Sequence, residues 1–294
     1  MVQVAYGTSG RCGARKGRHG LIAALLVLAA PALAQPKPAF RTPDDRCRAA
    51  ATVAAFEPKL PLSRQALAET GRLTIVALGS SSTAGPGASG QHRSYPAVLQ
   101  AELRRRLPGR EITVLNRGAS GQSAYEMLAR MDVDVIDEKP GLVIWQTAVA
   151  DAVRDIGEDK LARILGKGIR KLHDSGIELI MMDLLWLPRE SRYPHYDDYR
   201  AVLAKTAAKN GVTVFPRYAM MNSWSRTRQF TSEELVGMDG LQVVDAGYRC
   251  LAIRLADGIA AALLPAGEGG AASPAQASPA TAEPTPAPAP VSGQ

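Results

Sequence analysis

The chain has 294 residues, of which 46% are hydrophobic, 21% charged and 5% aromatic. This composition excludes a chain that is disordered throughout and a chain embedded in a membrane over most of its length. The formal net charge is +7, but residues 1–34 contain four Arg or Lys and no acid, which leaves +3 for the remaining 260 residues. So small a charge gives no electrostatic case for a polyanion, and we exclude nucleic acid as a partner.

The first 34 residues have the organisation of a secretory signal peptide. A basic stretch ends at Arg18, residues 21–34 are apolar throughout, and this segment closes with Ala-Leu-Ala, which has small residues where signal peptidase reads them. We therefore expect cleavage before Gln35 and a periplasmic or secreted protein with no integral membrane segment. An uncleaved anchor is the alternative, although fourteen apolar residues are few for a bilayer.

Two cysteines remain after such a cleavage. Cys47 lies near the new N-terminus and Cys250 near the end of the folded part. In an oxidising compartment these two residues allow one intramolecular disulfide, which we predict. Two separate buried thiols are the alternative.

Strands and helices alternate between residues 71 and 264, after an N-terminal arm over residues 35–70. Alternation with helix-length spacers predicts a parallel sheet covered by helices on both faces, with ligand sites at the carboxyl ends of the strands. In chain order, we predict five strands over 73–78, 112–115, 142–146, 178–183 and 212–215, and helices over 95–107, 124–136, 160–173, 196–209 and 248–264.

The composition changes at Pro265. Residues 265–294 contain seven prolines, nine alanines and no aromatic residue. Such a segment buries too little apolar surface to offset the entropy of ordering it, so we predict a disordered tail.

The loop after the first strand contains a glycine pattern that is typical of nucleotide-binding proteins. Residues 85–90 match G-x-G-x-x-G, but the match begins seven residues beyond Leu78 and includes Pro86, and no acid follows the second strand. No Gly-Lys-Ser/Thr follows Gly79 either, which excludes a Walker-type phosphate loop. We interpret the pattern as a flexible glycine loop and expect no cofactor.

Polar and glycine-rich segments follow the strand ends. The first strand leads into GSSSTAG (79–85), where a serine on a tight turn would present its hydroxyl at the site end of the sheet. The second leads into NRGASG (116–121) and the third into TAVAD (147–151), while MDGLQ (238–242) precedes the last helix.

In this order and at these strand ends, the segments resemble the SGNH/GDSL hydrolase family of esterases, lipases and carbohydrate deacetylases, over about residues 73–264. The resemblance implies a three-layer α/β/α, flavodoxin-like fold with a five-stranded parallel sheet, and serine ester hydrolysis. It places the nucleophile at Ser81, and Ser80 stands where the family's Gly-Asp-Ser has Asp. It also implies an oxyanion hole of Ser81, Gly118 and the position of Ala150, and a triad completed by Asp239 and the position of Gln242.

Two of these positions depart from the family pattern. Ala150 stands where the family has the oxyanion Asn, and Gln242 stands where it has the catalytic His. An amide cannot accept a proton near neutral pH, and a serine hydroxyl needs such a base. Loss of the base costs roughly 10⁴- to 10⁶-fold and loss of an oxyanion donor roughly 10²- to 10³-fold. We expect a site that keeps its shape but has little turnover.

Two histidines are candidates for a substitute base. His195 lies in the loop after the fourth strand and His92 in the loop after the nucleophile turn. Either residue needs hydrogen-bond reach of Ser81. A metal site of His195 with Asp197 and Asp198 is a further alternative, but these acids also fit the negatively charged first turn of a helix, and we expect no metal.

Two functions from different classes follow. The first is an exported hydrolase that removes acyl or acetyl groups from an envelope glycan or lipid through Ser81. The second is a catalytically silent relative that serves as an envelope binding or interaction module. In both cases the expected partner is a small-molecule or glycan ester, and we expect a monomer.

Overall fold

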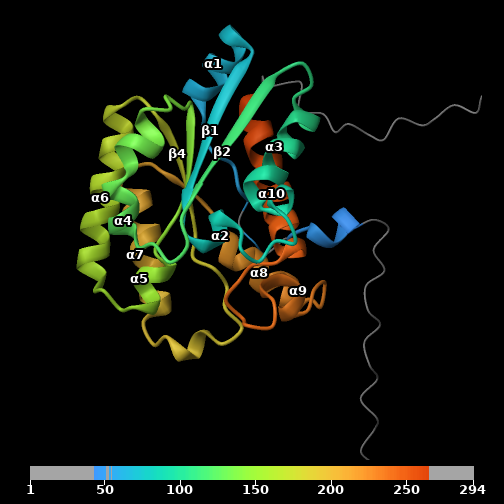
Figure 1. Cartoon of the computed structure of the whole chain (residues 1–294), viewed down its shortest axis with the longest axis vertical. Coiled ribbons are helices and arrows are strands. Elements are labelled where there is room, and N and C mark those ends of the chain that lie inside the picture. The colour runs from blue at the N-terminus through green and yellow to red at the C-terminus, as the bar shows by residue number, and fades with distance from the viewer. Residues whose placement is uncertain (1–42, 51–52, 54, 265–294) are drawn as a thin grey trace, which may run out of the picture. The chain divides into compact units, whose positions relative to one another are not determined.

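Five parallel strands form the centre of the fold in the order β2-β1-β3-β4-β5 (Figure 1). This is the flavodoxin-like, doubly wound order, in which the chain starts near the middle of the sheet and winds first one way and then the other. The predicted α/β class and all five predicted strands are confirmed. The strands are β1 (Arg72–Gly79), β2 (Glu111–Gly118), β3 (Leu142–Gln146), β4 (Glu178–Met182) and β5 (Thr213–Phe215).

The structure, a computed structural model, describes residues 43–50, 53 and 55–264. The predicted signal peptide and the predicted Pro/Ala-rich tail lie outside these residues. Within them, no helix is both long and apolar enough to cross a membrane.

Helices cover both faces of the sheet (Figure 1). One face carries α1 (Pro61–Thr70), α3 (Tyr95–Arg106) and α10 (Asp245–Leu263), and the other carries α4 (Ala124–Ala129), α6 (Glu158–Asp174) and α7 (Tyr196–Lys209). The core lies between these layers, where Ile75, Val76 and Ile144 of the central strands have no exposed surface. Shorter helices and turns lie in the connections: η1 (Pro43–Cys47), α2 (Ser81–Ala84), η2 (Gln91–Arg93), α5 (Val149–Val153), η4 (Glu190–Arg192), α8 (Arg217–Arg226) and α9 (Ser232–Val236).

The helix predicted over residues 124–136 is interrupted in the structure. α4 ends at Ala129, and a π-helical turn, η3 (Asp132–Ile136), follows it. Met127, Met131 and Val135 are all fully buried. Their spacing of four residues explains why the sequence looked like one continuous amphipathic helix.

A disulfide and the polar contacts of one arginine side chain fix the N-terminal arm to the domain. Cys47 and Cys250 are bonded, with their Cα atoms 4.8 Å apart, so the predicted pairing is confirmed. Next to it, Arg46 donates to the carbonyl of Gln229 at 2.7 Å and forms an ion pair with Glu234 at 2.9 Å. The arm therefore holds the segment that leads into α10.

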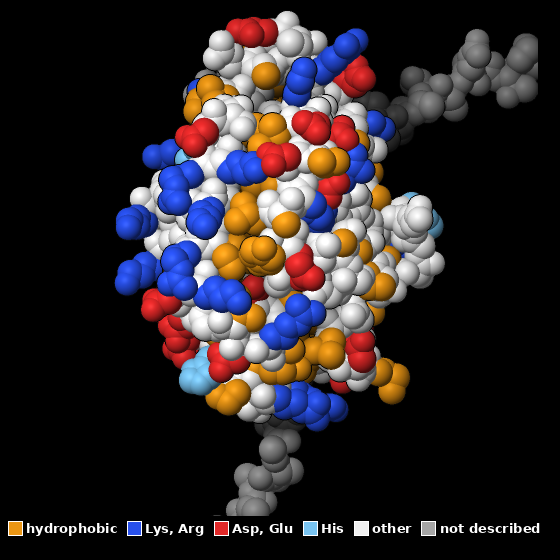
Figure 2. Space-filling model, turned by 60° about the vertical axis from the view of Figure 1, so that its left-hand side comes forward, with side chains coloured by type: hydrophobic (Ala, Val, Ile, Leu, Met, Phe, Trp, Pro, Cys, Tyr) orange, Lys and Arg blue, Asp and Glu red, His pale blue; other side chains and the backbone are white. Residues whose placement is uncertain are grey.

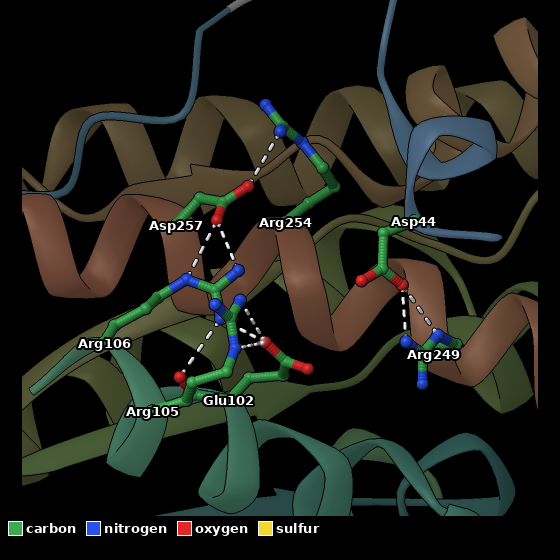
Figure 3. Close-up of polar contacts among 7 residues, drawn as sticks. All are labelled: Asp44, Glu102, Arg105, Arg106, Arg249, Arg254 and Asp257. Atoms are coloured by element: carbon green, nitrogen blue, oxygen red, sulfur yellow. Dashed lines mark hydrogen bonds and ion pairs between the residues drawn. The ribbon is translucent and has the colours of Figure 1, made fainter. Parts of the chain in front are cut away.

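Ion pairs join α10 to α3 and to η1 (Figure 3). Arg106 of α3 lies between Glu102 of its own helix and Asp257 of α10, with Nη2 2.6 Å from the Asp257 carboxylate. Arg249 of α10 pairs with Asp44 of η1, where Nε and Oδ1 are 3.0 Å apart. These contacts lock α10 against the sheet face that α3 covers.

Candidate functional site

The nucleophile turn is anchored by a buried glutamine. Ser81 is the first residue of α2, directly beyond the carboxyl end of β1, and is half-buried. Gln146 ends β3 and is fully buried; its Oε1 accepts hydrogen bonds from the N–H of Ser80 at 2.9 Å and from the hydroxyls of Ser80 and Thr83 at 3.2 Å. Gln146 is not among the site residues predicted from the sequence, although a polar residue at the end of an otherwise apolar strand is a usable signal.

A backbone amide lies next to the serine hydroxyl. The N–H of Gly121, in the loop after β2, donates to Ser81 Oγ at 3.2 Å. The carbonyl of Gly121 accepts from Arg154 Nη2 at 2.8 Å. Arg130 holds the same region, because its Nη2 donates to the carbonyls of Gly79 at 3.1 Å and Arg117 at 2.8 Å. The loop after β2 is thus tied to the end of β1.

The family resemblance implied that Gly118 belongs to the oxyanion hole. Its N–H donates to Asn116 Oδ1 at 2.9 Å instead of facing Ser81. A Cβ at this position would lie 2.1 Å from the backbone nitrogen of Ala84, so a glycine is needed for α2 to pack on β2. The amide beside Ser81 belongs to Gly121, three residues later in the same motif. Both glycines were visible in the sequence, and nothing in the motif itself distinguished their roles.

The segment after β3 offers no side-chain donor at Ala150. This residue lies in the first turn of α5, is half-buried, and carries only a methyl group. Ala148 precedes it with φ of 71°, a left-handed conformation that favours glycine. Asp151 is fully buried and accepts from the N–H of Ala124 at 2.9 Å. Burial raises the pKa of Asp151, and the hydrogen bond from Ala124 opposes this effect only in part.

Asp239 and Gln242 do not form the acid–base pair of a serine hydrolase. Asp239 is exposed, and its Oδ1 accepts the backbone N–H groups of Leu241 at 2.9 Å and Gln242 at 3.0 Å, so it caps its own loop. The Oε1 atom of Gln242 is buried without a hydrogen-bond partner. Within the described part of the chain, no hydrogen bond joins either residue to Ser81.

The glycine loop after α2 packs on the segment that contains Gln242. A Cβ at Gly87 would lie 2.2 Å from the carbonyl oxygen of Val243. Two residues later, the N–H and hydroxyl of Ser89 donate to Asp245 at 2.8 and 2.6 Å. The G-x-G-x-x-G pattern therefore belongs to a loop that packs closely on the backbone before α10, whereas we expected a flexible loop.

His92 extends from this loop toward Asp245. Burial of Asp245 opposes its ionisation, but the hydrogen bonds from Ser89 and the charges of Arg93 and His92 outweigh burial and lower its pKa. His92 is exposed and also lines a cleft of about 520 Å³ beside α2, together with Ala84 and the end of β2. The remaining lining residues include the polar Gln91, Ser94, Gln100 and Asn116 and the apolar Pro96, Ala97 and Val114, so the cleft has a mixed lining.

His195 lies in a separate cluster. It precedes α7, and its Nδ1 is 3.2 Å from Asp198 Oδ2; Glu158 offers a carboxylate oxygen within 4.8 Å of both ligand atoms. All three side chains are exposed, and Asp197 pairs with Arg200 instead. The His195 ring is thus hydrogen-bonded within its own surface cluster, and no hydrogen bond among the described residues links His195 or His92 to Ser81.

A doubly wound parallel sheet with a serine on the first turn after β1, and an amide from the loop after β2 beside its hydroxyl, defines an SGNH-type hydrolase architecture. Sequence comparison gives the same class: residues 46–264 match the non-GDSL lipase-like family. The chain belongs to this family, which is an esterase- and lipase-like family of the SGNH type.

Individual relatives are distant. An arylesterase from Vibrio mimicus is 26% identical over 124 residues, which are 42% of this chain and 60% of that protein. The structure is similar to the lipase/acylhydrolase from Enterococcus faecalis, with 22% identity, a TM-score of 0.54, and coverage of 64% of this chain and 96% of the other. An acetylxylan esterase from Geobacillus stearothermophilus has 19% identity, a TM-score of 0.55, and coverage of 64% and 94%. At these identities the structural likeness establishes the fold alone.

Proposed function

We propose that the chain is an exported ester hydrolase that acts through Ser81 with strongly reduced turnover. One observation carries this proposal: Ser81 Oγ is paired with the N–H of Gly121 at 3.2 Å, yet among the residues that the structure describes no general base hydrogen-bonds it. This contact supports Ser81 as the nucleophile and Gly121 as an oxyanion donor, while no described residue is hydrogen-bonded to Ser81 as a base.

The chemistry of acyl transfer explains why this arrangement is slow. Attack of the Ser81 hydroxyl on an ester carbonyl requires removal of its proton, and the amide of Gln242 cannot accept it. The tetrahedral intermediate would receive hydrogen bonds from the N–H groups of Ser81 and Gly121, but none from the methyl group of Ala150. Both steps of the acyl-enzyme cycle lose rate for the same two reasons.

The proposed substrate is an acyl or acetyl ester of an envelope glycan or lipid. The cleft beside α2 supports an alcohol part that is rich in hydroxyl groups, because Gln100, Asn116 and Ser94 supply hydrogen-bonding groups along its wall. The apolar segment at residues 21–34 supports export, and the Cys47–Cys250 disulfide is typical of an oxidising compartment.

His92 is the better candidate for a substitute base. It lies on the cleft wall with Ala84 and close enough to Asp245 to lower the pKa of that carboxyl group, whereas His195 is paired with Asp198. An acid beside an imidazole is the arrangement that orients a base in serine hydrolases.

Hydrolysis of a small activated ester tests this function. We expect slow turnover by the wild type, no turnover by Ser81→Ala, a further loss in His92→Ala, and no change in His195→Ala. Equal rates for the wild type and Ser81→Ala would overturn the hydrolase proposal. Equal rates would favour the alternative, a catalytically silent binding module. The replacement of the family's His by Gln242 and of its Asn by Ala150 also favours this alternative.

A further inference from the structure

The outward face of α6 carries four basic side chains and no acidic one. Lys160, Arg163, Lys167 and Arg170 are all exposed. At 100° per residue these positions share one side of the helix, opposite the buried face that packs on the sheet. No acid occurs between Lys160 and His173, so the acids of α6 are confined to its two ends.

The neighbouring helix continues this surface. Lys205 and Lys209 of α7 are exposed and lie seven and eleven residues after Asp198. These spacings put them on the same side of α7 as Asp198, and that side faces α6, because Asp198 contacts Glu158 at the start of α6. We call the six residues Lys160, Arg163, Lys167, Arg170, Lys205 and Lys209 the basic face.

No ion pair between described residues neutralises the charges of the basic face. Among the described residues, none of the six has a carboxylate within 4.0 Å, whereas most other clusters of Arg on the surface do, as Arg105 and Arg106 illustrate. Figure 2 shows the result: Lys and Arg side chains gather down one side of the view, and acids lie mainly above and below them. The net charge of the whole chain does not reveal this surface, because acidic residues elsewhere in the chain offset its positive charge.

We propose that the basic face docks the protein on a membrane surface of anionic phospholipids. The outer sides of two adjacent helices form a broad area, about 15 Å along α6 and about 10 Å between the helix axes. The anionic headgroups of a bilayer can contact basic residues over the whole of such an area. A linear polyanion would contact only the residues along one line. Each Lys or Arg near an anionic membrane contributes favourably to its binding.

Docking in this way leaves the site uncovered, because Ser81 lies at the carboxyl edge of the sheet and not on the outer sides of α6 and α7. This proposal does not depend on turnover at Ser81.

Co-sedimentation of the full chain with vesicles tests the proposal. The vesicles contain either phosphatidylcholine alone or phosphatidylcholine with phosphatidylglycerol. The test variant is Lys160→Gln, Arg163→Gln, Lys167→Gln and Arg170→Gln combined. The matched control, Lys59→Gln, Arg64→Gln, Arg226→Gln and Arg228→Gln combined, removes the same charge from exposed residues that lie outside the basic face and have no ion pair.

We expect the wild type and the control to bind the anionic vesicles preferentially, with affinity that falls as salt rises. The test variant should lose this preference by at least about tenfold. Every variant keeps residues 21–34, so any contribution of that apolar segment cancels. Equal binding to both vesicle types by the wild type, or an equal loss in both variants, would overturn the proposal. Tighter binding to double-stranded DNA than to the anionic vesicles, lost in the test variant, would also overturn it and assign the basic face to a nucleic acid.

Discussion

The N–H of Gly121 donates to Ser81 Oγ at 3.2 Å, and on this contact we base the proposal that Gly121 contributes to the oxyanion hole. Gly118, three residues earlier, instead lets α2 pack on the end of β2. At Gly121 the feature that matters is the direction of the backbone N–H, which points at Ser81 Oγ. At Gly118 it is the lack of a side chain, which leaves room for α2.

Alanine substitutions separate these two requirements. A Cβ at Gly118 would lie 2.1 Å from backbone, so Gly118→Ala should destabilise the fold by about 3 kcal/mol or more. Gly121 has φ of 77° and nothing within 4 Å of a Cβ, so Gly121→Ala should cost only about 1–2 kcal/mol. Urea unfolding of both variants measures the difference; a larger loss in Gly121→Ala would contradict the assignment.

The disulfide should be a major source of stability. Cys47 and Cys250 are separated by 203 residues, and closing so long a loop stabilises the folded state by about 5 kcal/mol in the chain-entropy model. The Cys47→Ser/Cys250→Ser variant should lose much of this free energy of unfolding and should match the reduced wild type. Unfolded, unreduced wild type should show no titratable thiol other than Cys12. Three thiols would refute the pairing.

Ala148 is expected to carry backbone strain. Its φ of 71° costs an alanine about 1–2 kcal/mol, while glycine adopts this conformation freely. Ala148→Gly should therefore raise the free energy of unfolding by up to about 1 kcal/mol, after the entropy cost of glycine. Ala152→Gly, within α5 at an ordinary helical position, is the control and should lower it. Destabilisation by both substitutions would show that Ala148 is not strained.

The ion pairs in Figure 3 predict a specific acid dependence of stability. Burial opposes ionisation of Glu102, but hydrogen bonds and charge from Arg106 and Arg105 outweigh burial and lower its pKa. A lowered pKa in the folded state means that this stabilisation is complete above the ordinary pKa of glutamate and is lost as the pH falls through the lower value.

Arg106→Gln should weaken this dependence. We expect a loss of about 2 kcal/mol at neutral pH and a shallower decline of stability in acid. Arg105→Gln is the matched control, because Arg105 contacts the same carboxylate but is 64% exposed, and its effect should be smaller. Unfolding free energies measured from neutral to acidic pH test both expectations; parallel curves for Arg106→Gln and wild type would contradict them.

Most of the fold followed from the sequence because its signals are local. Strands such as residues 142–146 are apolar up to their last residue, and α6 has a clear apolar face, so their types and order could be predicted. The short helices α2, α5 and α9 could not, because their few residues carry no period and their positions depend on contacts with other segments. The end of α4 at Ala129 could not be predicted either. Residues at every fourth position stay buried across this interruption, so the pattern looks like one continuous helix.

The site was predictable only in part. The spacing of the motifs indicated Ser81, Ala150 and Gln242 as the positions to inspect. Hydrogen bonds between segments far apart in sequence decided the rest: Gln146 holds Ser80, and Gly121 rather than Gly118 faces Ser81. Hydrogen bonds between distant segments produce no periodic pattern in the sequence. The sequence alone therefore does not indicate which of the two glycines has its N–H beside Ser81.

Labelling with a fluorophosphonate probe tests the central claim most directly, because the reaction requires an activated serine. Wild type should label very slowly, and Gln242→His combined with Ala150→Asn should label at least about 10²-fold faster, provided that Asp239 turns to orient the new imidazole. Ser81→Ala in this background should abolish labelling, and Gln242→His alone should recover part of the gain. Rapid labelling of Ser81 in the wild type, or no gain in the double substitution, would contradict the account that Gln242 and Ala150 are what limit this site.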